Sequence, residues 1–246
     1  MSIKFSIVHP YFENNATLPL HVEQWSKIPK NQVELVIVDD HSGPNKGPDV
    51  SLLKDLQFPI KVFRVKNDIL WNVTGARNLG AYYARGEQLI MSDFDLVVGA
   101  ELISKLKTLD YTDNKVVYWP VMRKPDTEKT KNRFAKPHCN SFVINRDVFW
   151  RMGGYDEDFA GGWGYEDSHF HNILGKLFGL KNVILDNSGY FIWLDSAAHH
   201  PGTITIGRKG HKKNETLYYY KAKQTKDFRS DPTLRFEYEL IYDNGK

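Results

Sequence analysis

Two acidic clusters, far apart in the chain, are the strongest chemical features of this 246-residue sequence. Asp93-Phe94-Asp95 directly follows the apolar run Gln88–Met91, and Glu166-Asp167 closes a stretch of glycines and aromatics that begins at Gly161. Side chains two apart on an extended backbone point the same way, so both carboxylates of the first cluster can face one divalent cation. An acid pair beside glycines and aromatic rings suits a general base that faces a sugar.

The position of the first cluster after a strand is stronger evidence for a functional role than its residue pattern. A second triplet of the same kind, Asp156-Glu157-Asp158, shows that the pattern alone is weak evidence. Only Asp93-Phe94-Asp95 ends a buried strand, and ligands of α/β sheets bind beyond the carboxyl ends of strands. We therefore interpret the first triplet as functional and the second as loop acids.

Two further segments of the first half carry polar groups at element ends. Asp39-Asp40 follows the apolar run Val33–Val38 and offers acceptors for a base N–H and for ribose hydroxyls, although a turn or helix cap would use the same residues. Arg77, in a small-residue segment that opens a helix, could hold ribose or phosphate oxygens. Close packing of a small-residue helix face is the competing explanation.

Aromatic residues distinguish the second cluster from an ordinary helix start. A capped helix after a glycine turn would explain Glu166 and Asp167 but not the nearby Trp163 and Tyr165, which offer flat apolar faces for a sugar ring. Desolvation and mutual repulsion would raise the pKa of one of the two acids. We expect this stretch to bind an acceptor and to supply the base.

Histidines late in the chain are candidate metal ligands. His199-His200-Pro201 follows the last apolar run, and His211 is a rival. If a cation sits at Asp95, one of these rings could complete its shell, although a lone histidine is more often structural.

The elements that must position these groups alternate between strands and helices. We expect strands over Lys4–Val8, Val33–Val38, Ile60–Val65, Gln88–Met91 and Val116–Trp119, with helices near Leu18–Ser26, Val50–Leu56, Thr74–Ala84 and Ala100–Lys107. This alternation predicts an α/β fold with a mainly parallel sheet flanked by helices. Residues 122–138 are expected to form a long loop over the site, followed by a less regular half with a helix near Asp167–Phe178. No linker divides the chain, so we expect one domain, with a nucleotide half over about residues 1–120 and an acceptor half over 121–246.

Composition excludes several classes of protein. Hydrophobic content of 41% and charged content of 26% are ordinary for a globular protein, and a net charge of +3 does not indicate nucleic-acid binding. Residues 207–229 carry eight Lys/Arg against two acids, which suggests a solvated tail, a diphosphate grip or contact with an anionic membrane. The single Cys139 excludes an internal disulfide. No signal peptide or membrane span is recognisable, so a cytoplasmic location is expected, in a cell or in a virus-infected host.

These fragments, in this order, resemble the GT-A superfamily of nucleotide-sugar glycosyltransferases, particularly family 2. The resemblance runs from about Phe5 to Glu215 and includes Val8-His9-Pro10-Tyr11, Val38–Ser42, Ala76-Arg77-Asn78-Leu79-Gly80, Asp93-Phe94-Asp95 and Gly153–Phe159. Trp163-Gly164-Tyr165-Glu166-Asp167 is similar to the tryptophan-glycine-acid-acid motif of β-1,4-galactosyltransferases and chondroitin-type polymerases, and Lys213-Asn214-Glu215 to the family's terminal segment.

The resemblance implies a role for each matched position. The nucleotide would be bound by Pro10, Asp39, Asp40, Arg77, Asn78 and Asp93, with Mn²⁺ or Mg²⁺ on Asp95 and His200 (alternates Asp93, His199 and His211), and the sugar acceptor by Trp163, Gly164, Tyr165 and Glu166. Asp167 would be the catalytic base. About a dozen residues separate His200-Pro201 from Lys213, which departs from the family's spacing and leaves the choice of histidine open.

The expected activity is metal-dependent, inverting transfer of a sugar from a UDP-sugar, with a slight preference for galactose or N-acetylgalactosamine, to a hydroxyl of a glycan or glycoconjugate. Two alternatives remain. One is a non-catalytic module that binds sugar nucleotides or glycans. The other is a haloacid-dehalogenase-like phosphatase, because the run Ile90–Val98 also resembles the first motif of that family, although that motif usually follows the first strand.

Overall fold

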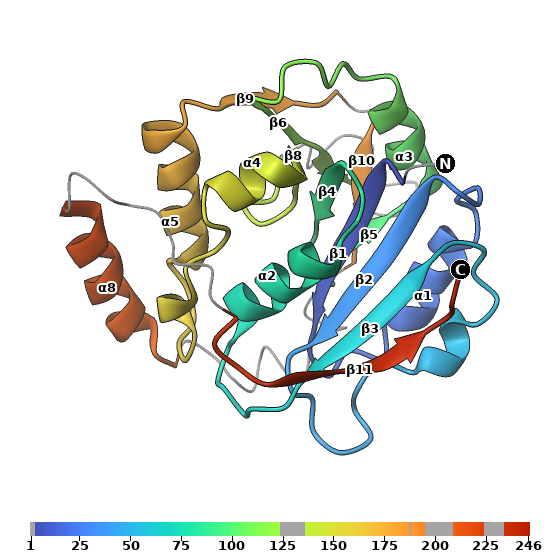
Figure 1. Cartoon of the computed structure of the whole chain (residues 1–246), viewed down its shortest axis with the longest axis horizontal. Helices are drawn as coiled ribbons and strands as arrows, with labels where there is room; N and C mark the ends of the chain where they lie inside the picture. Colours follow the sequence, from blue (N-terminus) through green and yellow to red (C-terminus); the bar gives the residue numbers. More distant parts are fainter. Residues whose placement is uncertain (1–2, 124–135, 187, 195–208, 224–233) are drawn as a thin grey trace, which may run out of the picture.

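The computed structural model describes residues 3–123, 136–186, 188–194, 209–223 and 234–246. A large sheet forms the centre of the molecule, and helices cover both of its faces (Figure 1). In chain order the first half contains β1 (Phe5–Tyr11), α1 (Leu18–Trp25), β2 (Val33–Asp39), the 3₁₀ helix η1 (Val50–Leu53), β3 (Ile60–Val65), α2 (Val73–Tyr83), β4 (Gln88–Met91), β5 (Leu96–Val98), α3 (Ala100–Lys107), β6 (Val116–Trp119) and β7 (Val121–Arg123).

The second half is less regular, as the sequence predicts. Its elements are β8 (Phe142–Asn145), α4 (Arg146–Arg151), the 3₁₀ helix η2 (Glu157–Phe159), α5 (Glu166–Asn172), the π-helical turn η3 (Ile173–Leu177), β9 (Lys181–Ile184), β10 (Tyr190–Trp193), α8 (His211–Lys223) and β11 (Tyr238–Asp243). Within the described residues, no helix is long and apolar enough to cross a membrane.

Eight strands form the large sheet in the order β11-β3-β2-β1-β4-β8-β6-β9, and β5, β10 and β7 form a small second sheet. Strands β3, β2, β1 and β4 run parallel, as do β6 and β9, whereas β8 and β11 are antiparallel to their neighbours. The parallel core confirms the predicted α/β fold class. Because β1, β2 and β4 are parallel, their carboxyl ends, and the polar residues that follow them, meet at one edge of the sheet.

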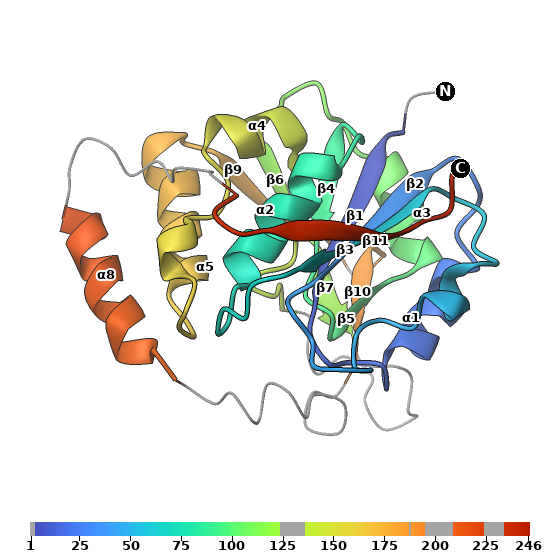
Figure 2. The ribbon, with the colours of Figure 1, turned by 60° about the horizontal axis from the view of Figure 1, so that its bottom comes forward.

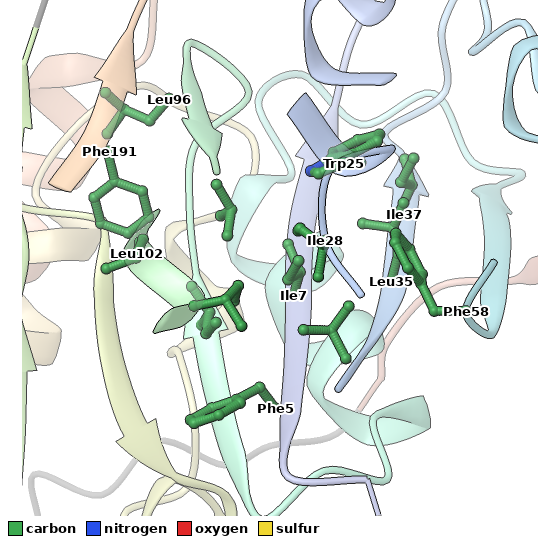
Figure 3. Packing of buried hydrophobic residues seen from close by; sticks show 14 of the residues in the cluster. Phe5, Ile7, Trp25, Ile28, Leu35, Ile37, Phe58, Leu96, Leu102 and Phe191 are labelled. Carbon is green, nitrogen blue, oxygen red and sulfur yellow. The ribbon is translucent and has the colours of Figure 1, made fainter. Parts of the chain in front are cut away.

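Alternating side chains of the central strands bury both faces of the sheet. Phe5 and Ile7 of β1, Leu35 and Ile37 of β2 and Trp25 of α1 belong to one buried cluster, part of which Figure 3 shows. The opposite face holds Val8 of β1 and Val36 and Val38 of β2, and α2 packs against both strands there. Buried apolar area of this extent is the main stabilising term for the sheet.

A glycine lets α2 lie close to the sheet. A Cβ added to Gly80 would lie 2.5 Å from Cγ1 of Val8 and 3.5 Å from Cγ2 of Val38. Any larger residue would push the helix outward, and the side chains of α2 that face the site would move with it.

Four expectations from the sequence need correction or completion. The helix expected over Val50–Leu56 is only the 3₁₀ turn Val50–Leu53, and the helix expected from Asp167 starts one residue earlier and ends as a π-helical turn. The loop expected over 122–138 begins as strand β7, and residues 124–135 lie outside the described part. Strand β11 and helix α8 were not predicted. Segment 207–229 reads as a charged tail, yet much of its described part forms α8 beside α5 (Figure 2).

Candidate active site

The turn that carries Asp93 and Asp95 is held from behind by two buried histidines. The ring Nδ1 of His9, on β1, lies 2.9 Å from the carbonyl of Ser92, and Nε2 of His21, on α1, lies 3.1 Å from the carbonyl of Phe94. Because a carbonyl only accepts, each ring donates its N–H. Burial lowers the pKa of His9 to about 4, so this ring is neutral at physiological pH. Asp93 and Asp95, the candidate metal ligands, therefore lie on a turn whose position is fixed by residues of the buried core.

Asp93 forms an ion pair with the guanidinium of Arg77, whose side chain is only 1% exposed. The imidazole Nδ1 of His138 lies 3.6 Å from Oδ2 of the same carboxylate. Burial opposes ionisation of Asp93, but Arg77 and His138 together hold its pKa below the ordinary value. The carboxylate is thus kept charged by partners from α2 and from the segment before β8.

Asp95 differs from Asp93 because its Oδ1 is buried without a hydrogen-bond partner in the described structure. Burial, and then the nearby charge of Asp93, raise the pKa of Asp95 to about 6. An unsatisfied carboxylate oxygen beside a second carboxylate fits a hard cation such as Mn²⁺ or Mg²⁺, which prefers oxygen ligands. The carboxylate oxygens of this turn are therefore compatible with the expected metal, with Asp95 as its first ligand.

The rest of a metal shell is not assembled from the described side chains. Across residues 3–123, 136–186, 188–194, 209–223 and 234–246, no three or more His, Cys, Asp or Glu side chains are grouped to hold an ion. His199 and His200 lie outside the described residues. His211 is described, and its ring stacks on Trp163 with centroids 5.4 Å apart. Two carboxylates alone would leave most of the shell to phosphate oxygens and water.

The expected nucleotide-binding acids end β2. Asp39 is fully buried, and its Oδ1 accepts hydrogen bonds from the backbone N–H and the hydroxyl of Ser42, while Arg64 Nη1 lies 3.5 Å from Oδ2. Oδ2 of Asp40 accepts a hydrogen bond from the backbone N–H of Asn72 at 2.9 Å, and its Oδ1 is buried without a hydrogen-bond partner in the part of the chain that the structure describes. Burial raises the pKa of Asp40 to about 8. Asp39 therefore holds the turn at the end of β2 through Ser42, and both Oδ2 of Asp39 and Oδ1 of Asp40 remain buried acceptors without a hydrogen bond among the described residues.

Pro10 and Asn78 lie within elements of the fold. Pro10 is buried in β1 opposite Val38. The amide of Asn78 is used by the protein: Nδ2 donates to the carbonyl of Tyr155 at 2.8 Å and to Oε1 of Glu157 at 2.9 Å, and Oδ1 accepts from the N–H of Tyr155 at 2.9 Å. These contacts tie α2 to the Gly153–Phe159 segment, and contact of either residue with a nucleotide stays a prediction.

Glu166 and Asp167 form the first turn of α5. The preceding Tyr165 has a left-handed backbone (φ 71°), which is unusual for a bulky residue. Glu166 is 5% exposed, its Oε2 has no hydrogen-bond partner in the described structure, and burial raises its pKa against the opposing charge of Arg77. Asp167 is half-buried, and its Oδ1 accepts from the N–H of Ser168 at 2.6 Å.

Arg77 and Tyr155 connect the two acidic clusters. The Arg77 guanidinium lies 5.0 Å from the centre of the Tyr155 ring and acts on the charges of both Asp93 and Glu166. Tyr155 is fully buried; desolvation raises the pKa of its phenol against the opposing charge of Arg77, and the charges of Asp93, Asp167 and Glu166 also raise it. Acids that are far apart in the sequence therefore line one site.

Sequence reasoning missed three residues of this site: Tyr155, His138 and Trp71. Trp71 has a left-handed backbone (φ 53°), its ring lies 6.4 Å from that of Trp163, and its indole faces Glu166. Strain of this kind concentrates at functional sites. No spacing or composition marks Trp71, since it lies in a short loop before α2.

Comparisons with known proteins agree with this geometry. Residues 6–184 match the family model described as glycosyl transferase family 2. Among solved structures, Staphylococcus aureus TarS 1–349 in complex with UDP-GlcNAc has a TM-score of 0.64 at 16% identity, over 78% of this chain and 59% of that chain. GalNAc-T7 with UDP, GalNAc and Mn²⁺ has a TM-score of 0.61 at 18% identity, over 94% of this chain and 53% of that one.

These structural matches show a shared GT-A fold, and this chain spans 37% to 61% of the lengths of the matched chains. A search of curated proteins found no match. The family match covers most of the chain, including β1, β2, β4 and the acid pair at the start of α5. The protein belongs to glycosyl transferase family 2 and has a GT-A fold.

Proposed function

We propose that the protein transfers a sugar from a UDP-sugar to a hydroxyl of a glycan or glycoconjugate, with inversion and with help from Mn²⁺ or Mg²⁺. Membership of the family supports transfer of a sugar. Two structural neighbours, one in complex with UDP-GlcNAc and the other with UDP, GalNAc and Mn²⁺, support a UDP-linked donor and a divalent cation. The tryptophan motif at Trp163 favours galactose or N-acetylgalactosamine, as the resemblance implies.

One observation carries the proposal: Arg77 is buried between the two acidic clusters. It pairs with Asp93, beside the uncommitted oxygen of Asp95, and its charge reaches Glu166, beside Asp167. A donor diphosphate near Asp95 and an acceptor hydroxyl near Asp167 would then lie on opposite sides of one anomeric carbon. That arrangement suits a single displacement.

The chain's own residues account for the proton and for orientation. The Asp167 carboxylate takes the proton of the acceptor hydroxyl while that oxygen bonds to the anomeric carbon, and the bond from this carbon to the phosphate oxygen breaks with its electron pair leaving on UDP. Glu166, Trp163, Gly164 and Tyr165 orient the acceptor. A cation at Asp95, with a late histidine such as His200 as a further ligand, would neutralise charge on the leaving diphosphate.

Replacement of Asp167 tests the base. Asp167→Asn keeps the shape and removes the proton acceptor, so we expect transfer to fall by about 10²- to 10⁴-fold with UDP affinity changed less than about twofold. The matched control is Asp147→Asn, an exposed acid in the first turn of α4. Turnover is measured as UDP released from UDP-galactose, UDP-GalNAc, UDP-glucose and UDP-GlcNAc. Wild-type turnover in Asp167→Asn would refute the assignment.

Replacement of Asp95 tests the cation. Because the other described carboxylate of the turn is already paired with Arg77, Asp95→Ala should abolish the increase in UDP affinity that Mn²⁺ produces. Isothermal titration of UDP with and without Mn²⁺ measures this difference. An unchanged metal effect in the variant would contradict the assignment.

The two alternatives fit these observations less well. In the phosphatase alternative Asp93 would be the nucleophile, yet it is ion-paired with a buried guanidinium. Family membership argues against a binding module without catalysis. Hydrolysis of p-nitrophenyl phosphate would favour the phosphatase, and UDP binding without turnover of any UDP-sugar would favour the module.

A further inference from the structure

Helix α8 lies beyond the residues that match the family model, yet it touches the proposed acceptor site. It carries several charges and has almost no apolar face, and its one fully buried residue is Asn214. A polar helix gains little from burial of apolar surface, so specific polar contacts must hold it in place. Those contacts converge on residues 159–165, here called the glycine loop.

Asn214 bonds the glycine loop at three points. Its Nδ2 lies 3.0 Å from the carbonyl of Phe159, 2.8 Å from that of Gly162 and 3.0 Å from that of Gly164. One amide therefore fixes both ends and the middle of the loop. Because these carbonyls are held from one point, a shift of α8 would move the whole loop.

Further contacts join the start of α8 and the two residues before it to the glycine loop. The N–H of Trp163 donates to the carbonyl of Lys209 at 2.9 Å, and Nζ of Lys213 lies 3.1 Å from the carbonyl of Ala160. Gly210 and Gly162 meet directly: a Cβ on Gly210, whose φ is +74°, would lie 2.4 Å from Cα of Gly162. Only glycines permit this approach.

The far end of α8 is anchored by charge. Lys221 forms ion pairs with both Asp156 and Asp158 of the segment that leads into the glycine loop. The acids that the sequence suggests are loop acids thus hold α8, and part of the basic segment 207–229 is neutralised within the protein. Membrane contact through the remaining charges stays a prediction.

The glycine loop ends at the strained Tyr165, directly before Glu166 and Asp167. A left-handed backbone at a non-glycine residue is strained and persists only where neighbours enforce it. The neighbours are on α8: the Tyr165 ring lies 5.1 Å from His211, and its hydroxyl donates to Oε1 of Glu215 at 3.0 Å. Helix α8 therefore holds the conformation from which α5 starts.

We propose that Asn214 is a positioning residue, which sets the glycine loop so that Trp163 and the Glu166-Asp167 pair face the acceptor. The proposal rests on the proposed function, because it assigns α8 to the acceptor side of that site. The proposal predicts different effects on the acceptor side and on the nucleotide side of the site. Loss of the Asn214 contacts disturbs the base and the acceptor platform but leaves Asp93 and Asp95, on the turn after β4, in place.

The first test replaces Asn214 by its near-isostere. Asn214→Asp keeps the shape but sets carboxylate oxygens against three carbonyls, and Asn214→Ala removes the amide without adding charge. We expect kcat for UDP release from UDP-galactose or UDP-GalNAc with Mn²⁺ to fall by about 10- to 100-fold in both. The dissociation constant of UDP and the KM of the donor should change less than about twofold, a division that general loss of structure would not produce. Thr216→Ala is the control, because this exposed hydroxyl donates only within α8.

A second pair of variants reaches the same junction through the backbone. Gly210→Ala should reproduce the loss of kcat, whereas Gly175→Ala should not, because a Cβ on Gly175 meets nothing within 4 Å. Wild-type kcat in both Asn214→Asp and Gly210→Ala would overturn the proposal. A loss of UDP affinity that equals the loss of kcat would also overturn it.

A measurement without substrate distinguishes this proposal from the proposed function. Hydrogen exchange of the free protein should rise in Asn214→Asp at residues 160–168 and stay unchanged at residues 88–96. If the wild-type protein released no UDP from any of the four UDP-sugars, the proposed function would fail, and exchange alone would then decide the positioning role. Unchanged exchange at residues 160–168 would refute it.

Discussion

Removal of the Arg77 charge is the most informative test of how the site is built. In Arg77→Met the side chain keeps much of its length, so little cavity forms, but the Asp93 carboxylate loses its main partner. Arg77 is 1% exposed and the Asp93 side chain 24% exposed, so the pair is largely shielded from water. The substitution therefore leaves a partly buried charge without compensation.

The expected cost follows from that burial. Breaking a buried ion pair costs about 3–5 kcal/mol, and the partial exposure of Asp93 reduces this to about 2–3 kcal/mol. Loss of the contact between the guanidinium and the Tyr155 ring adds about 1 kcal/mol. We expect the free energy of unfolding to fall by about 3 kcal/mol near neutral pH.

The stability difference between the wild-type protein and Arg77→Met should depend on pH. In the wild-type protein the pKa of Asp93 is lowered, so its pair contributes stability above the unfolded pKa and loses it as pH falls through the folded value. In Arg77→Met the burial of Asp93 is opposed only by the weaker effects of His138 and His9, so the pKa of Asp93 rises relative to the wild-type protein and the variant gains relative stability when Asp93 takes up a proton. The difference between the two proteins should therefore shrink from pH 7 towards acid.

Urea denaturation of both proteins at about pH 7 and about pH 5 measures this difference. Lys181→Met is the control, because its pair with Asp113 is exposed and should contribute less than about 1 kcal/mol. In Arg77→Met/Asp93→Asn, loss of both charges should recover part of the cost. A cost for Arg77→Met below about 1 kcal/mol at neutral pH, or one that does not change with pH, would refute the reasoning.

Two further predictions concern the elements behind the site. Gly80→Ala would place a Cβ 2.5 Å from Cγ1 of Val8 and should lower the free energy of unfolding, measured by urea titration, by about 1–3 kcal/mol. Gly175→Ala is the control and should be neutral or slightly stabilising, because a Cβ there meets nothing within 4 Å. Equal effects of the two substitutions would contradict the packing argument. The pKa of His9 is lowered from 6.5 to about 4, so between these pH values the ring stays neutral in the folded protein while it takes up a proton in the unfolded chain. The free energy of unfolding should therefore fall by up to about 3 kcal/mol as the pH drops from 6.5 to about 4, and His9→Asn should make this dependence weaker. An unchanged pH dependence of unfolding in His9→Asn would contradict this prediction.

Most of the first half could be predicted from the sequence because its signals are local. Runs such as Val33–Val38 and Gln88–Met91 are mostly apolar and strand-length, and they become β2 and β4 nearly residue for residue. Acids placed directly after such runs must lie at the carboxyl edge of a parallel sheet, which is where Asp39, Asp40, Asp93 and Asp95 are found. The family match confirms the resemblance on which the enzyme class was predicted.

The second half was harder because its elements depend on contacts with distant segments. Helix α8 has no apolar periodicity to reveal it, since Asn214 and Lys221 hold it through polar partners. Strand β11 is largely exposed and pairs antiparallel with β3, far from it in the chain. Neither feature leaves a pattern that short-range reasoning detects.

The site shows the same division between local pattern and tertiary contact. Residue types and spacing alone determined which carboxylates could do chemistry: Asp95 after a strand and Asp167 at a helix start. Only the tertiary structure decided that Arg77 stands between the two clusters, that Trp71 faces Glu166, and that α8 holds the loop before Asp167. The physical reason is that spacing orders side chains along one element, whereas burial and pairing of charges depend on which elements the fold brings together.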